Sequence, residues 1–134
     1  MILAETALIW RTMLDQRLKP FGLSQAKWRV LLHLAKGGNG MVQRELAERV
    51  GVEGPTLVRL LDRMTADGWI ERRDAPHDRR SKTVHLTDKA RSVTRRMEAV
   101  ARKLRHELLA GIPADDLRTC LAVFSQIKRQ AGRL

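Results

Sequence analysis

The stretch Gln43–Met64, QRELAERVGVEGPTLVRLLDRM, has the pattern of two short helices joined by a tight turn. The first helix is expected over Gln43–Val50, where the small side chain of Ala47 allows a second helix to cross closely. Gly51 follows at the position where a helix end needs a left-handed residue. The second helix is expected over Pro55–Ala66, because proline is tolerated as a first helical residue. The stretch therefore predicts a helix-turn-helix.

The second of these helices has a buried face and an outward face. Leu57, Leu61 and Met64 recur at helical spacing and are expected to seat the helix on the core. A helix fits the major groove of B-DNA, and its N-terminal residues reach the base edges. The outward residues expected to contact DNA are Pro55, Thr56, Arg59, Leu60 and Arg63. Arg59 can bind guanine O6 and N7, and Thr56 can bind a phosphate or a base edge. For Leu60, contact with a thymine methyl group competes with simple exposure of an apolar residue.

A charged β-hairpin is expected directly after the helix-turn-helix. Its strands are predicted over Trp69–Arg73 and Lys82–Leu86, with a polar loop between them. The hairpin residues expected to contact DNA are Arg79, Arg80 and Lys82. A narrow, A·T-rich minor groove attracts inserted arginine, and Asp78 can hold one arginine while the other reaches outward. A solvated charged loop is the alternative, but the position after a helix-turn-helix favours DNA contact.

Four further helices are predicted on either side of this region. They are expected over Ile2–Leu18, Ser24 to about Lys36, Thr87 to about Ala110, and Ala114 to about Gly132, with a turn at Gly37–Gly40. The first and last have apolar stripes that need cover, which packing on each other and on a second copy of the chain would supply. The predicted fold is mostly α with a small β-hairpin wing. Residues 1–20 form a dimerisation helix, 21–90 a winged helix-turn-helix, and 91–134 a connecting helix and the C-terminal dimerisation helix.

The charge balance favours a polyanionic partner. The chain has 134 residues, with 26 Lys and Arg against 15 Asp and Glu, which gives a net charge of +11. This excess favours nucleic acid first and an acidic membrane second, although a merely basic protein is also compatible with it. No apolar run is long enough for a membrane span, and the N-terminus lacks the features of a signal peptide. We therefore expect a cytoplasmic protein, with the single cysteine, Cys120, as a small core residue rather than a redox sensor.

Other classes of function find less support in the sequence. The four histidines lie in different predicted elements, and no phosphate loop, nucleophile elbow or Cys-x-x-Cys motif is present. We therefore predict no enzyme activity, no metal site and no cofactor. The alternative to a DNA-binding regulator is a winged-helix module that binds RNA or bridges proteins.

Nearly the whole chain resembles the MarR family of transcriptional regulators. The resemblance is carried by residues 23–28 (LSQAKW), 45–47 (ELA), 51–62 (GVEGPTLVRLLD), 78–80 (DRR) and 86–90 (LTDKA), and residues 9–11 and 17–20 are similar to SlyA-like members. It implies a homodimer that binds pseudopalindromic promoter DNA, and many members of the family release DNA when small aromatic anions or other phenolic compounds bind. SlyA-like members also activate transcription. The chain departs from the family at Pro113, where Ser or Thr is common, and in the Pro76-His77 pair of the wing.

A ligand site also follows from this resemblance. If the first two helices pack as in the family, Arg17 and His33 lie within reach of a cleft beside Trp28. An apolar ring wall with cationic groups suits a benzoate-like anion. The alternative for Trp28 is a plain core residue.

Overall fold

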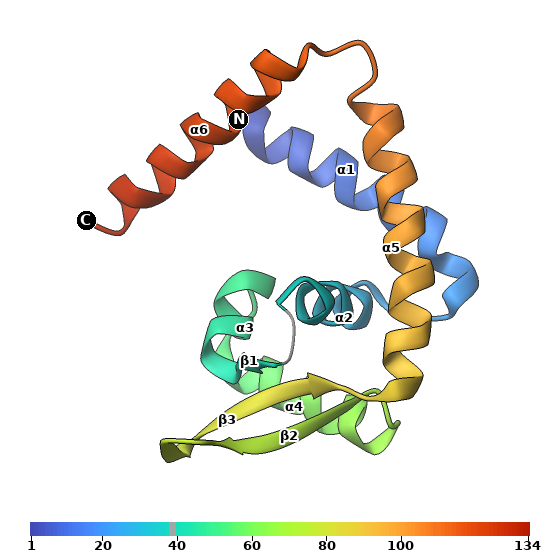
Figure 1. Ribbon diagram of the computed structural model, residues 1–134, viewed down its shortest axis with the longest axis vertical. Helices are drawn as coiled ribbons and strands as arrows, with labels where there is room; N and C mark the ends of the chain where they lie inside the picture. The colour runs from blue at the N-terminus through green and yellow to red at the C-terminus, as the bar shows by residue number, and fades with distance from the viewer. Residues whose placement is uncertain (38–39) are drawn as a thin grey trace. The chain divides into compact units, whose positions relative to one another are not determined.

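Six helices and one small sheet make up residues 1–37 and 40–134, the part of the chain that the computed structural model describes (Figure 1). The helices are α1 (Ile2–Leu18), α2 (Gln25–Gly37), α3 (Gln43–Val50), α4 (Gly54–Ala66), α5 (Asp88–Leu108) and α6 (Ala114–Ala131). A 3-10 helix, η1 (Lys19–Phe21), follows α1. The predicted fold class is confirmed. The centre of the predicted Gly37–Gly40 turn and the side chain of Arg79 lie outside the described part.

The chain divides into two compact units, Met1–Arg102 and Lys103–Leu134. The first unit contains α1 to α4, the sheet and most of α5, and the predicted DNA-binding region 21–90 lies within it. The second unit contains the end of α5 and all of α6.

The core of the first unit is built from the apolar faces of its helices. Leu31 of α2, Leu46 of α3, Leu61 of α4 and Met97 of α5 are fully buried. Full burial of such a side chain contributes about 1.5–3 kcal/mol relative to exposure. These contacts fix the helix-turn-helix on α2, as the apolar spacing in the sequence predicts.

The tight turn of the helix-turn-helix is confirmed at Gly51. Its φ is +73°, in the left-handed region, and its N–H donates to the carbonyl oxygen of Ala47 at 2.9 Å. The next N–H, of Val52, donates to the same oxygen at 3.2 Å. The turn therefore closes α3 and directs the chain into α4.

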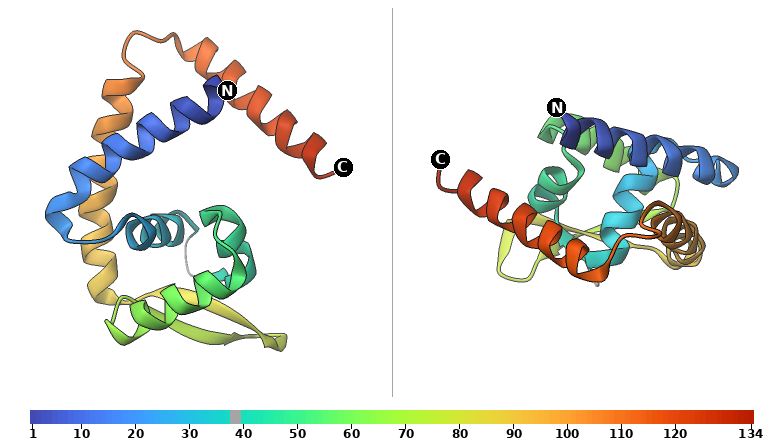
Figure 2. Two further views of the ribbon diagram at one scale, coloured as in Figure 1. Left: turned by 180° about the vertical axis from the view of Figure 1, so that it is seen from behind. Right: turned by 90° about the horizontal axis from the view of Figure 1, so that it is seen from above.

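The sheet is antiparallel, with the strand order β1-β3-β2. Its strands are β1 (Met41–Val42), β2 (Ile70–Ala75) and β3 (Asp78–Leu86), and β2 and β3 form the long hairpin of the wing (Figure 2). The predicted loop between the strands is wrong for most of its length, because pairing continues to Ala75 and Asp78. Asp74 pairs with Lys82, whereas Ala75 pairs with Asp78, so β3 has extra residues in a bulge near the tip. Charge attraction between Asp74 and Lys82 favours this extension.

Gly40 is expected to be intolerant of any side chain. Its φ is +123°, and an added Cβ would overlap the imidazole ring of His85, whose Nε2 lies 2.8 Å from the hydroxyl of Thr83. Backbone strain at such a φ and overpacking each cost about 1–3 kcal/mol. Gly40→Ala should therefore lower the free energy of unfolding, measured by urea denaturation, by at least about 1 kcal/mol.

The matched control is Gly54→Ala at the start of α4. A Cβ there meets nothing within 4 Å, and no positive φ strains it. This variant should be neutral or slightly stabilising. Equal stability of the two variants would contradict the packing of Gly40 against His85.

Cys120 is exposed on α6, and α6 has no buried residue. The predicted core position of Cys120 is therefore wrong for the single chain, because an amphipathic stripe is buried only where another element covers it. No helix in the described ranges is long and apolar enough to cross a membrane.

Candidate nucleic-acid interface

The outward face of α4 carries four of the five side chains expected to contact DNA. The exposed residues are Pro55, Thr56, Arg59 and Arg63. The fifth, Leu60, is only 5% exposed and packs in the core, so its predicted outward orientation is wrong. The reason is helical geometry, because Leu60 lies three residues after Leu57 and four before Met64, in the same buried stripe. Leu60 is therefore not available for contact with DNA.

An ion pair between α4 and β2 occupies the one carboxylate of α4 that could pair with the exposed arginines of this helix. The Arg72 guanidinium contacts the Asp62 carboxylate at 2.6 Å. Asp62 lies three residues after Arg59, at the spacing where it could otherwise pair with it on one helix face. Neither Arg59 nor Arg63 has a carboxylate partner among the described residues. Sequence reasoning missed this pair because it depends on how β2 packs on α4.

In the wing, Asp78 orders the backbone at the start of β3. One carboxylate oxygen accepts a hydrogen bond from the backbone N–H of Arg80 at 2.9 Å, and the other accepts from the hydroxyl of Ser81 at 3.4 Å. The side chain of Arg80 is exposed and has no acidic partner in the described part of the chain. The predicted contact residue Arg79 lies in β3, but its side chain is outside the described part.

Lys82, also predicted to contact DNA, is paired within the wing. Its ammonium group contacts the carboxylate of Asp74 on β2. In the same hairpin, Arg73 contacts Glu71 at 2.9 Å. The cationic side chains of the wing therefore fall into two groups. Lys82 and Arg73 are balanced by a neighbouring carboxylate, whereas Arg80 is not.

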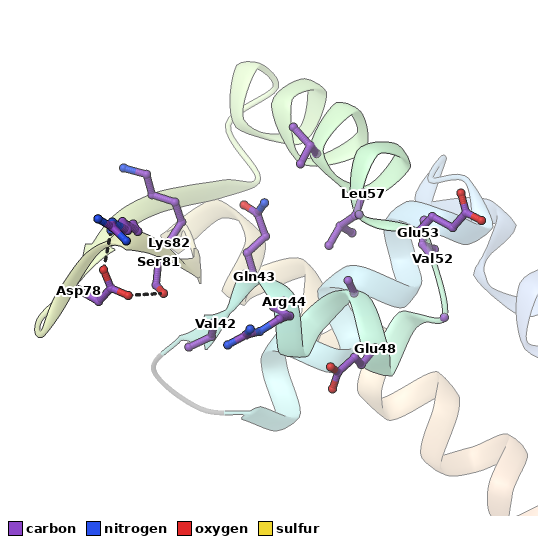
Figure 3. A pocket seen from close by; sticks show the side chains of 15 residues that line it. Val42, Gln43, Arg44, Glu48, Val52, Glu53, Leu57, Asp78, Ser81 and Lys82 are labelled. Atoms are coloured by element: carbon purple, nitrogen blue, oxygen red, sulfur yellow. Dashed lines mark hydrogen bonds between the residues drawn. The ribbon is translucent and has the colours of Figure 1, made fainter. Parts of the chain in front are cut away.

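An open groove of about 850 Å³ separates the helix-turn-helix from the wing (Figure 3). One side is formed by α3 and the first turn of α4, and the other by the start of β3. Gln43 and Arg44 of α3 line it, together with Ser81 and Lys82 of β3. Sequence reasoning assigned DNA contacts only to the second helix and the wing, and so missed the two α3 residues. Their position at the outward start of α3 was the available signal.

Comparisons with known proteins identify the family of this fold. Residues 21–81 match the sequence profile described as MarR family. The chain is also similar to the transcriptional regulator PA3341, with 44% identity, a TM-score of 0.92, and coverage of 99% of this chain and 97% of that chain.

The chain belongs to the MarR family.

Two other crystal structures have the same fold. A MarR-family regulator from Silicibacter pomeroyi has 27% identity and a TM-score of 0.81, with 94% of this chain and 84% of that chain covered. Apo wild-type MarR from E. coli shares the fold at 24% identity and a TM-score of 0.74, with 94% and 93% of the two chains covered. The chain is thus a DNA-binding transcriptional regulator of winged-helix type and not an enzyme, as predicted. The likeness to SlyA-like members stays a prediction.

A strip of basic residues lies on the open face of α2 in this MarR-family chain. Most of the helix circumference is buried, but Arg29, His33 and Lys36, spaced at i, i+4 and i+7, are at least partly exposed. Arg29 donates to the carbonyl oxygen of Val50 in α3 at 2.6 Å. The pKa of its guanidinium is lowered by burial and by the nearby charge of Arg11. Burial lowers the pKa of His33 as well, with further contributions from Arg29, Lys36 and Arg49.

His33 is expected to make the fold less stable in mild acid. Its pKa in the folded chain is lower than the usual value of about 6.5, which applies to the unfolded chain. The unfolded state therefore binds a proton more readily than the folded state. The contribution of neutral His33 to the free energy of unfolding is fully present above about pH 6.5, and it is lost as the pH falls from there toward the lower pKa of the folded chain. Urea unfolding between pH 8 and pH 5 should show this loss, and His33→Gln should remove part of it.

The control for this measurement is His77→Gln, which changes an exposed histidine at the wing tip. That variant should keep the pH profile of the wild-type protein. If His33→Gln also keeps it, the burial and the cations around His33 do not govern the acid response.

The three residues predicted to bind a ligand do not share one face. Trp28 is buried, and its indole N–H donates to the carboxylate of Asp15 in α1 at 2.8 Å. His33 lies five residues later on α2, about 140° around the helix axis. Arg17 lies two residues after Asp15, about 200° around α1. This arrangement argues against one small ligand in contact with all three side chains.

No group of three or more metal-ligating residues occurs within the described ranges.

Proposed function

We propose that this MarR-family regulator binds pseudopalindromic promoter DNA as a homodimer, with α4 in the major groove and the wing in the adjacent minor groove. The observation that supports this is the distribution of unbalanced charge. Arg59 and Arg63 on α4 and Arg80 on β3 are exposed and lack acidic partners within the described residues, whereas Arg72 and Arg73 are paired. Pro55 and Thr56, at the exposed start of α4, and Arg79 complete the proposed contact set, with Lys82 as a contact only if it leaves Asp74.

The exposed apolar residues of the terminal helices support the homodimer. Ile2, Leu8 and Ile9 of α1 are 79%, 60% and 59% exposed, and Leu121 and Ile127 of α6 are 65% and 51% exposed. Each of these helices therefore exposes several large apolar side chains, and exposed apolar surface often marks a protein–protein interface. A second copy of the chain that covers both helices would remove this surface from water and place two α4 helices on one duplex.

Binding to duplex DNA is tested by selecting fragments of genomic DNA and measuring their affinity by fluorescence anisotropy. Selected duplexes should share an inverted repeat whose half-sites lie about one helical turn apart. Affinity should fall steeply with salt, because phosphate contacts release counterions. Single-stranded RNA should compete poorly. Selection of no common repeat, or equal competition by RNA, would favour the RNA-binding alternative.

We further propose that a small aromatic carboxylate weakens DNA binding by favouring another spacing of the two α4 helices. In the basic strip of Arg29, His33 and Lys36, the guanidinium and ammonium groups of Arg29 and Lys36 offer the positive charge that such an anion needs. The effect cannot exceed the differential affinity of the ligand for the two arrangements. Titration with salicylate at fixed ionic strength should quench or shift tryptophan fluorescence and lower operator affinity. A response no larger than that to chloride, across a panel of phenolic acids, would contradict the proposal.

A further inference from the structure

The groove between the helix-turn-helix and the wing has a defined place in the proposed complex. If α4 lies in the major groove and the wing in the neighbouring minor groove, the sugar–phosphate strand between these two grooves must pass between them. The groove of about 850 Å³ is bounded by α3 and α4 on one side and by β3 on the other, so it lies on that path (Figure 3). A DNA strand in this groove would contact residues of α3 and β3, in addition to the outward face of α4 and the wing tip.

The charges of the groove are distributed unevenly. Arg44 extends toward the wing side, whereas Glu48 and Glu53 lie farther from the wing (Figure 3). Arg44 is exposed, and no hydrogen bond or ion pair engages its guanidinium among the described side chains. On the opposite wall, Asp74 pairs with Lys82, and the Asp78 carboxylate accepts from the Arg80 backbone N–H and the Ser81 hydroxyl. The side chain of Arg80, which also lines this wall, has no acidic partner among the described residues. A phosphate is therefore favoured at the wing end of the groove, beside Arg44.

The start of α3 adds hydrogen-bond donors to this groove. This helix begins at Gln43 without a side-chain cap, so its first N–H groups have no side-chain acceptor. The positive end of a helix adds to the attraction for an anion.

We propose that the groove seats the DNA strand that separates the major from the minor groove, and that Arg44 neutralises one phosphate of that strand. This inference rests on the proposed docking of α4 and the wing on DNA. It assigns Arg44 a role that does not depend on base sequence, in contrast to Arg59. The ligand is a backbone phosphodiester, which carries one negative charge and accepts hydrogen bonds from the planar guanidinium group.

The test compares Arg44→Ala with Arg49→Ala on the selected operator and on an unrelated duplex. Arg49 is on the same helix and exposed, but it is paired with Glu45 at 3.0 Å and does not line the groove. Arg44→Ala should lower affinity by the same factor on both duplexes. It should also reduce the slope of log affinity against log salt by about one per protomer. Arg49→Ala should leave the slope unchanged, and Arg44→Lys should keep most of it.

A second measurement identifies the phosphate itself. Operators that carry one neutral methylphosphonate at a time are bound by wild-type protein and by Arg44→Ala. One position should weaken wild-type binding but cause no further loss with Arg44→Ala, because the contact is already gone. If the losses add at every position and the salt slope is that of wild type, the inference is wrong. If wild-type protein binds no duplex, the proposed function fails instead, so the two failures are distinguishable.

Discussion

Arg59→Ala is expected to weaken operator binding by about 1–3 kcal/mol per half-site, because a bidentate contact with guanine contributes that much to discrimination. Arg59 lies one turn into α4, is exposed, and has no carboxylate partner in the described part of the chain. The loss should be concentrated on one base pair of each half-site. Competition titrations with operators changed at single positions should show that this variant no longer distinguishes bases at that pair.

The control for Arg59→Ala is Arg73→Ala in the wing. Arg73 is also exposed, but Glu71 already balances its charge. Its removal should change affinity far less and should not relax base preference. Thermal unfolding should be nearly unchanged in both variants, since neither side chain is buried. If Arg59→Ala binds the operator as wild type does, α4 does not read the major groove through this residue.

The helix-turn-helix could be predicted because its determinants are local in sequence. Apolar residues at helical spacing, Gly51 at the left-handed position and Pro55 in the first turn of α4 together fix two helices and their connection. The bounds of α1 and α3 match the prediction for the same reason. A wing between α4 and α5 was predictable from the polar, charged stretch that interrupts the helical pattern.

The remaining errors come from interactions between elements. The prediction assigns only Leu57, Leu61 and Met64 to the buried face of α4 and so leaves Leu60 on the outward face. Helix packing buries a wider stripe, which includes Leu60. The strand β1 has only two residues, too few to show a period of two. The pairing of Arg72 with Asp62 depends on the packing of β2 on α4, which no local pattern encodes.

The ligand site and the groove also depend on how the elements pack together, which the local sequence pattern does not encode. The resemblance predicts one ligand site for Arg17, Trp28 and His33. The hydrogen bond from Trp28 to Asp15 and the position of His33 on α2 instead direct these side chains to different faces. Conversely, Arg44 becomes a candidate contact only once β3 is seen across from α3. Charge and exposure are properties of single residues, but a binding surface is defined by which residues the fold brings together.

The largest effect on assembly is expected from carboxylates placed on the apolar face of α6. Phe124 and Ile127 are 38% and 51% exposed, lie three residues apart, and belong to a helix with no buried residue. In the proposed homodimer this face is buried, so the double variant Phe124→Glu with Ile127→Glu would bury two charges without partners. Sedimentation should show a monomer. Operator affinity should fall about 10²–10⁴-fold, because the second half-site is no longer bound intramolecularly.

The control adds a charge to the same helix on its other side. Thr119 is exposed and lies about 200° around the axis from Leu117, away from the apolar stripe. Thr119→Glu should remain a dimer with near wild-type affinity. Because the core of the first unit, including Leu46, Leu61 and Met97, involves no residue of α6, the double variant should keep its helical circular dichroism. A double variant that still sediments as a dimer would show that α6 does not form the interface. A folded monomer with weak DNA binding would instead link dimerisation directly to operator recognition.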